Sequence, residues 1–163
     1  MPKTSNQAIA HPNLLDSELA DSMGYLVRRT FRSFTHSLEE RLAGYDISIS
    51  MWFFLRSLWE GDGKTQKELS EELDLTQPTT VAAMDNLARR GLIRRKRNSV
   101  DRRKVNIYLT KAGVELRGSL VGFAKEVNAI ALQGLSPAEV ELVRQALTKM
   151  NDSLASAAAK SKE

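Results

Sequence analysis

The chain has 163 residues, 42% hydrophobic and 27% charged, so it can form a packed core and wholesale disorder is excluded. It contains no cysteine, which excludes disulfides, thiolate metal sites and thiol redox switches within these residues. The first residues lack the apolar core of a signal peptide, and the longest strongly apolar run, 51–55, is far shorter than the roughly 20 residues of a membrane helix. We therefore expect a cytoplasmic protein with no membrane partner.

The net charge of +4 is distributed unevenly along the chain. Between Arg89 and Lys104 there are nine basic residues and one acid, Asp101, so this block carries +8 and the remainder carries −4. The basic residues are Arg89, Arg90, Arg94, Arg95, Lys96, Arg97, Arg102, Arg103 and Lys104. A solvated face usually mixes both signs, whereas charge segregated in this way is typical of a phosphate-binding surface.

The first predicted element is a long helix over residues 16–43, with apolar side chains at spacings of three to five. Its apolar stripe comprises Leu19, Met23, Leu26, Val27, Phe31, Phe34, Leu38 and Leu42. Gly44 is the expected stop. A second helix is expected from its cap Ser48 to about Glu60, and the turn 61–63 then ends it.

Two short helices and a hairpin are expected next. Thr65 and Glu68 form a capping box that begins one helix, and Thr76 caps a second helix that ends before Gly91. Two short strands, 94–97 and 105–109, follow around a polar turn. A helix-turn-helix followed directly by such a hairpin indicates a winged helix-turn-helix.

Two further helices complete the chain. Thr110 caps the first, which Gly134 stops, and the second begins at the capping box formed by Ser136 and Glu139. The inward positions of the first are Leu116, Leu120, Phe123, Val127 and Ile130. The second has Val140, Val143, Leu147, Met150 and Leu154 at alternating spacings of three and four. This seam is typical of a helix that packs against another helix, and we expect the residues after it, 155–163, to fray.

The helix that begins at Thr76 is expected to read DNA, because its face opposite the apolar stripe carries small or hydrogen-bonding groups. Gln77 is suited to adenine, and the methyl groups of Thr79, Val81 and Ala82 to thymine. The predicted groove-facing contacts are Gln77, Pro78, Thr79, Val81, Ala82 and Asn86. The predicted phosphate contacts are Arg89, Arg94, Arg95 and Arg97, and Arg102 or Arg103 is expected to reach the minor groove.

At this point the sequence resembles the MarR family of bacterial regulators. The family's wing signature, Asp-x-Arg followed by Leu-Thr, is present as Asp101, Arg103, Leu109 and Thr110, and the end of the recognition helix is similar at 87–93. The resemblance implies that Asp101 and Arg103 shape the wing. It also implies a two-fold homodimer built from the terminal helices, with one recognition helix and one wing for each half-site. Ala82 departs from the pattern, since many members place an arginine there.

The fold class that follows is mainly α with a β wing, a winged helix-turn-helix with long N- and C-terminal dimerisation helices. The expected segments are a flexible tail 1–13, an N-terminal dimerisation helix 14–47, a DNA-binding domain 48–110, C-terminal dimerisation helices 111–158 and a flexible tail 159–163.

Regulators that resemble this chain commonly release DNA when a small phenolic or aromatic acid binds. Trp52, Arg56 and Trp59 share one helix face, and two aromatic rings with a guanidinium between them suit a planar anion. Tyr25 and Arg28 would complete such an effector site. The alternative is that the tryptophans pack against the first helix and Arg56 extends into solvent.

An enzyme is not expected, and neither is a cofactor. Gly63-Lys64-Thr65 resembles the end of a phosphate-binding loop, but the glycine required five positions before Gly63 is Leu58. His11 and His36 have no partner at metal-ligand spacing. We therefore predict a homodimeric repressor of a pseudo-palindromic operator in double-stranded DNA, relieved by a small aromatic or anionic effector. The alternatives are a non-specific architectural DNA-binding protein, a ligand-independent activator, or a winged helix that binds protein or RNA.

Overall fold

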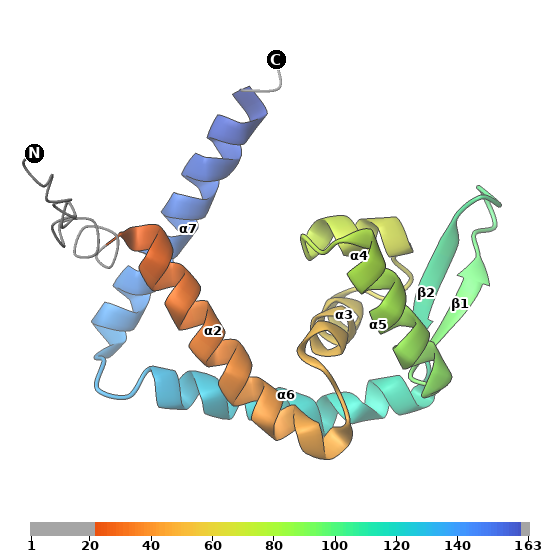
Figure 1. Ribbon diagram of the computed structural model, residues 1–163, viewed down its shortest axis with the longest axis horizontal. Helices are drawn as coiled ribbons and strands as arrows, with labels where there is room; N and C mark the ends of the chain where they lie inside the picture. Colours follow the sequence, from red (N-terminus) through yellow and green to blue (C-terminus); the bar gives the residue numbers. More distant parts are fainter. Residues whose placement is uncertain (1–21, 161–163) are drawn as a thin grey trace, which may run out of the picture. The chain divides into compact units, whose positions relative to one another are not determined.

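The computed structural model describes residues 22–160, which form two compact units that meet within one helix, between Glu115 and Leu116. In chain order the elements are α2 Met23–Leu42, the 3-10 turn η1 Ala43–Tyr45, α3 Ile49–Glu60, α4 Gln66–Glu72, α5 Gln77–Arg89, β1 Ile93–Arg97, β2 Val105–Leu109, α6 Lys111–Ala131 and α7 Pro137–Lys160 (Figure 1). The strands pair antiparallel, with Arg95 opposite Ile107. The predicted fold class, mainly helical with a two-stranded wing after a helix-turn-helix, is confirmed.

The first unit has an apolar core to which α3, α4, α5 and the hairpin all contribute. Its fully buried apolar side chains are Leu42, Phe54, Leu55, Leu58, Leu69, Met84, Leu87 and Ile107. Among the described residues of this core, Thr80 is the one polar residue whose side chain is fully buried. Its hydroxyl donates to the Thr76 carbonyl at 3.0 Å, so its burial leaves no unmade hydrogen bond. This core fixes α5 and the hairpin relative to each other.

Helix α2 buries only one end of its predicted apolar stripe. Leu38 and Leu42 are buried, whereas Met23 and Phe31 are more than half exposed. The ring of Phe31 lies nearly parallel to that of Phe53 on α3, with 6.4 Å between the ring centroids. The described part of the chain thus leaves much of the apolar face of α2 open to solvent.

Helix α2 ends within one residue of the predicted position, but the turn after it does not use Gly44. Ser22 is the N-cap, because its hydroxyl accepts a hydrogen bond from the backbone N–H of Tyr25 at 3.2 Å. The start that we expect at Asp16 lies outside the described residues. At the other end α2 ends at Leu42 with Ala43 as its C-cap, and the chain then continues through η1 and turns at Asp46, whose φ is 56°. Aspartate tolerates this left-handed conformation better than most residues, so a glycine is not required.

Helix α7 is longer than expected. Gly134, with a φ of 84°, separates it from α6 as predicted. It then continues to Lys160, past Ala155, where we expect fraying. The reason is local, since residues 155–159 include four alanines, the strongest helix former. Residues 161–163 lie outside the described part.

The base of the hairpin is fastened to the segment that precedes α4. The N–H of Gly63 donates to the Ile107 carbonyl at 3.0 Å, and the N–H of Ile107 donates to the Lys64 carbonyl at 2.8 Å. Gly63 has a φ of 82°, and a Cβ there would lie 2.8 Å from the ring of Tyr108, so both backbone and packing require glycine. The hairpin is therefore anchored at its base and projects beyond α5 at its tip (Figure 1).

A small polar network joins α3 to α4 beside this base. The Lys64 ammonium donates to the Glu72 carboxylate at 2.7 Å and to the Ser57 hydroxyl at 2.9 Å. Ser57 in turn donates to the other oxygen of Glu72 at 2.8 Å. The hydrogen bond from Lys64 is the main cause that lowers the pKa of Glu72.

Candidate nucleic-acid interface

Helix α5 has one buried face and one exposed face. Thr80, Ala83, Met84 and Leu87 are buried. The exposed residues are Gln77, Pro78, Thr79, Val81, Ala82, Asp85, Asn86 and Arg89. At 100° per residue, the line furthest from the buried stripe runs through Pro78, Ala82, Asp85 and Arg89. All six residues that we predict to contact bases therefore lie on the exposed side of this helix.

The three polar side chains that we predict to contact bases already have protein partners. The amide of Gln77 donates to the Ser70 hydroxyl at 3.3 Å, which joins the start of α5 to α4. The hydroxyl of Thr79 lies 2.9 Å from that of Thr76, the N-cap. The Asn86 carbonyl oxygen accepts from Arg89 at 2.5 Å. These bonds orient the side chains in the free protein, and reading a base requires each to exchange or share its partner.

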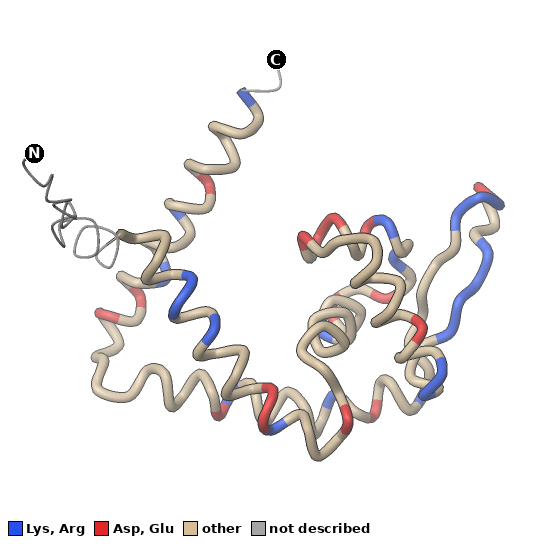
Figure 2. The backbone as a smooth tube through the Cα atoms, in the orientation of Figure 1, with Lys and Arg blue, Asp and Glu red and all other residues tan. Residues whose placement is uncertain are grey.

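The basic block lies along the hairpin and the end of α5 (Figure 2). Some of its members contact other groups of the protein, and others do not. Arg94 lies over the ring of Tyr108, with 5.1 Å to the centroid, and Arg95 donates to Asp85 at 2.6 Å. Arg90 donates to the backbone carbonyls of the η1 turn. Within residues 22–160 no side-chain hydrogen bond or ion pair is found for Lys96, Arg97, Arg102 or Lys104.

The tip of the hairpin is shaped by two short acceptors. The side-chain oxygen of Asn98 accepts from the N–H groups of Val100 and Asp101 at 2.8 and 2.9 Å. The Asp101 carboxylate accepts from the backbone N–H of Arg103 at 3.0 Å and from its Nε at 3.2 Å. The hydrogen bond from the Arg103 side chain is the main cause that lowers the pKa of Asp101. Arg102 and Arg103 remain exposed beside it.

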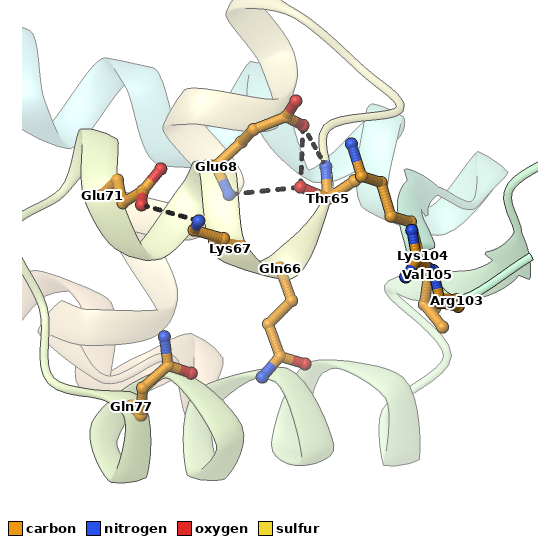
Figure 3. Close-up of a pocket in the computed structure, with 9 residues that line it drawn as sticks. All are labelled: Thr65, Gln66, Lys67, Glu68, Glu71, Gln77, Arg103, Lys104 and Val105. Carbon is orange, nitrogen blue, oxygen red and sulfur yellow. Dashed lines mark hydrogen bonds and ion pairs between the residues drawn. The ribbon is translucent and has the colours of Figure 1, made fainter. Parts of the chain in front are cut away.

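A cavity of about 570 Å³ separates the helix-turn-helix from the hairpin (Figure 3). It is lined by Thr65, Gln66, Lys67, Glu68, Glu71, Gln77, Arg103, Lys104 and Val105. The acids on its wall are already engaged: Lys67 lies 3.6 Å from Glu71, and Glu68 accepts from the Thr65 backbone N–H at 2.7 Å. That backbone hydrogen bond is the main cause that lowers the pKa of Glu68.

Sequence reasoning assigned no binding role to Gln66, Lys67 or Lys104, although each of them lines this cavity. The position of Lys104 within the basic block was a usable signal, whereas nothing in the local sequence indicates that α4 and the hairpin face one cavity. Gln77, on α5, faces the same cavity. Amide and cationic groups from three elements thus meet beside the exposed end of α5.

The residues predicted to bind an effector have other contacts in the structure. Trp52 is buried, and its ring meets that of Trp59 edge-on, with 5.7 Å between centroids. The Trp59 indole donates to the Gly113 carbonyl at 2.9 Å, and Arg56 donates to Glu60 at 3.3 Å. Tyr25 and Arg28 are exposed on α2. The two tryptophans thus contact each other and the start of α6, and the effector site at these residues stays a prediction.

A second cavity in the first unit, of about 430 Å³, lies between the end of α2, the start of α3 and α5. It is lined by Glu39, Ala43, Asp46, Ile47, Ser48, Met51, Asn86 and Arg90. Arg90 joins its two sides, because its guanidinium donates to the carbonyls of Tyr45 and Asp46. The C-terminal end of α5 is in this way fastened to the connection between α2 and α3.

The fold and this surface together define a winged helix-turn-helix DNA-binding protein. The model of the MarR family matches residues 47–105, from the start of α3 to the second strand. The chain is also similar to S. aureus MepR, whose structure was solved as a complex with DNA: the two are 30% identical, with a TM-score of 0.74, over 81% of this chain and 98% of that one. The chain belongs to the MarR family.

Curated relatives agree with this assignment. The HTH-type transcriptional regulator TtmR of Methylorubrum extorquens is 28% identical over 143 residues, 88% of this chain and 70% of TtmR. The organic hydroperoxide resistance transcriptional regulator of Bacillus subtilis is 28% identical over 116 residues, 67% of this chain and 79% of that protein. These relatives are transcriptional regulators rather than enzymes, and the present chain is a DNA-binding regulator of the same family. None of the helices described here is long and apolar enough to span a membrane.

Proposed function

We propose that this regulator works as a homodimer that binds a pseudo-palindromic operator in the cytoplasm and represses transcription by covering a promoter. The observation that carries the proposal is the apolar seam of α7, the set Val140, Val143, Leu147, Met150 and Leu154. Among the described residues of α7 none is buried, and Leu147 and Leu154 are 46% and 72% exposed. Apolar side chains repeated on one side of a long helix stabilise a protein only when a second surface covers them.

A second copy of the chain is the occupant that the DNA-binding unit requires. Each chain has one α5 and one hairpin, which suffice for a single half-site. A two-fold dimer places two recognition helices about 34 Å apart, one turn of B-DNA, and so matches an operator with two-fold symmetry. The seam therefore supports both the assembly and the symmetry of its binding site.

Two charge-introducing variants of α7 test the dimer. We expect Leu147→Asp, within the seam, to weaken dimer formation by at least about 100-fold, because a carboxylate would lose its hydration in an apolar contact. Leu142→Asp is the matched control: Leu142 is 67% exposed and lies on another side of α7. Sedimentation velocity at several protein concentrations gives the assembly state. Monomeric wild-type protein, or equal effects of both variants, would refute the proposed dimer.

Specific binding is tested separately by fluorescence anisotropy. A duplex taken from the DNA upstream of the protein's own gene is compared with a scrambled duplex across a salt series. Tight binding of the first, weakened by salt, supports a specific regulator. Equal affinity for both would favour an operator elsewhere or an architectural protein, and the absence of binding at low salt would favour a protein-binding winged helix. A reporter gene with the bound duplex beside its promoter then distinguishes repression from activation.

For the effector, we propose that a small aromatic acid enters the cavity between α2, α3 and α5. Arg90 and Asn86 offer a guanidinium and an amide there, and Met51 and Ile47 offer apolar contact. Displacement of Arg90 from the carbonyls of the η1 turn would free the end of α5 and shift the dimer away from the DNA-binding arrangement. Thiol oxidation is not available as a signal, because the chain has no cysteine.

Benzoate titrated into the protein–DNA complex tests this part, with acetate as the non-aromatic control. A coupled site is expected to lower DNA affinity by about 5- to 150-fold. An affinity that does not change while benzoate binds, as measured by calorimetry, would contradict the proposed coupling.

A further inference from the structure

The ion pair between Arg95 and Asp85 joins the wing to the middle of the recognition helix. Arg95 lies on β1, opposite Ile107, and shares a face of the hairpin with the buried Ile93. Because side chains alternate along a strand, this face is the one that packs on the domain, and Arg94 and Lys96 point the other way. The Arg95 Nη2 donates to the Asp85 Oδ1 at 2.6 Å, so its guanidinium lies on the exposed face of α5.

Asp85 is in an unexpected place for an acid. It belongs to the outermost line of α5, with Pro78, Ala82 and Arg89, which is the line that faces furthest away from the core. A carboxylate there approaches the phosphates of any duplex and disfavours binding, unless it directs a cation. Arg89, one helical turn away, does not pair with it, since its guanidinium bonds Asn86 instead.

Stability does not explain the pair. The Arg95 and Asp85 side chains are 38% and 51% exposed, and ion pairs at that exposure stabilise a fold weakly. What the pair does is fix a long, flexible side chain in one orientation. Arg97 is the contrast: it shares the strand face of Arg95, two residues further along, and has no side-chain partner within the described chain.

We infer that Arg95 reads a guanine in the major groove and that Asp85 is its positioning residue. This inference rests on the proposed sequence-specific binding and deepens it. The guanidinium has five N–H donors in a planar fork, and Asp85 occupies part of it. The remaining donors match the O6 and N7 acceptors of guanine, and guanine is the base that arginine recognises most often in this way. Arg95 thus supplies a long cationic side chain that can contact a base, whereas Pro78 and Ala82, on the outer line of α5, have short apolar side chains.

This role separates Arg95 from Arg89, Arg94 and Arg97, which are predicted to contact phosphates. A phosphate contact depends mainly on charge, so lysine can replace arginine there. A bidentate contact with guanine depends on the planar fork, so lysine cannot. A charge-conserving substitution therefore distinguishes the two roles.

The experiment is selection of bound duplexes from a random pool, followed by sequencing, with full-length wild type, Arg95→Lys and Asp85→Asn. For wild type we expect a two-fold symmetric preference that contains a guanine in each half-site. Both variants should lose discrimination at that one base pair by about 5- to 150-fold, the range of one bidentate contact, and keep the other preferences. The matched controls are Arg117→Lys and Glu115→Gln, the same chemical changes on α6, and they should keep the complete preference.

The outcomes separate this inference from the proposed function. If wild type selects no sequence, the proposed specific binding fails. If wild type selects a sequence and both variants retain the preference for guanine, Arg95 is a phosphate contact and the inference is overturned. If discrimination falls evenly at every position, the pair supports the fold of the interface and the inference is likewise overturned; circular dichroism of each variant confirms that it is folded.

Discussion

The winged helix-turn-helix segment and helix α7 both have apolar side chains at helical spacing, yet they bury them to different extents. Phe54, Met84 and Leu87 are fully buried in the first region, whereas α7 has no buried residue among those described. The same periodicity thus gives buried side chains in the winged helix-turn-helix and solvent-exposed side chains on α7. The difference teaches that periodicity identifies an apolar face, while the partner of that face depends on what else the chain supplies.

Removal of a buried side chain from the first region should have the largest effect on the free energy of unfolding. Phe54→Ala should lower the free energy of unfolding by about 3–5 kcal/mol, because it removes a fully buried ring and leaves a cavity. The measurement is urea unfolding followed by tryptophan fluorescence, which reports on the first unit because both tryptophans are there. Val100→Ala, at a side chain 94% exposed, is the control and should stay within about 0.5 kcal/mol. A loss below about 1 kcal/mol for Phe54→Ala would show that this core can collapse around the cavity.

The two capping boxes allow the same motif to be compared in both regions. Thr65 with Glu68 begins α4, and Ser136 with Glu139 begins α7, with equivalent hydrogen bonds in each. Thr65→Ala should lower the free energy of unfolding, measured by tryptophan fluorescence, by about 0.5–2 kcal/mol. The reason is that α4 belongs to the core whose unfolding the tryptophans report. Ser136→Ala should leave that unfolding transition unchanged and increase amide hydrogen exchange in the first turn of α7 only. Equal shifts for both variants would show that the two regions unfold as one, against the comparison drawn here.

The smallest expected effect is a pH dependence at Glu72. Its pKa is lower in the folded state than the ordinary value of 4.5, so its contribution to stability is present above that pH and is lost as the pH falls through the folded pKa. Glu72→Gln should therefore lower the free energy of unfolding by less than about 1 kcal/mol at pH 7, since both Glu72 and Lys64 are partly exposed. At low pH, where the Glu72 carboxyl is protonated, the substitution should not change the free energy of unfolding. Glu139→Gln, in α7, should not change the tryptophan-monitored transition at either pH. A constant difference between Glu72→Gln and wild type from pH 3 to 7 would mean that packing, not charge, is responsible.

Much of this fold was predictable because its signals are local. The caps at Ser48, Thr65 and Thr76, and the alternation along 105–109, are each visible within a few residues. The buried stripe of α5 follows from helical periodicity, and that stripe in turn defines the exposed face. The end of α2 was predictable to within one residue, but the left-handed residue after it is Asp46 rather than Gly44, because the sequence shows where a turn is permitted and not which nearby position adopts it.

The contacts within the site were not predictable to the same degree. A spacing of four suggests that Asp85 pairs with Arg89 on the helix, yet Asp85 bonds Arg95, ten residues away on a strand. The seven-residue spacing of Trp52 and Trp59 does bring their rings together, but the hydrogen bond from Trp59 to Gly113 spans 54 residues. Which polar groups satisfy one another depends on how helix and strand pack, and that information is distributed over the whole core.

The division of the basic block has a consequence for how a regulator finds its operator. Arg89, Arg90, Arg94, Arg95 and Arg103 already have partners within the protein. A random stretch of DNA must compete with these partners for the same N–H donors, and each phosphate contact that is not made lowers affinity. The protein therefore spends less time on each incorrect site than its charge alone implies, and it examines more of a genome in a given interval.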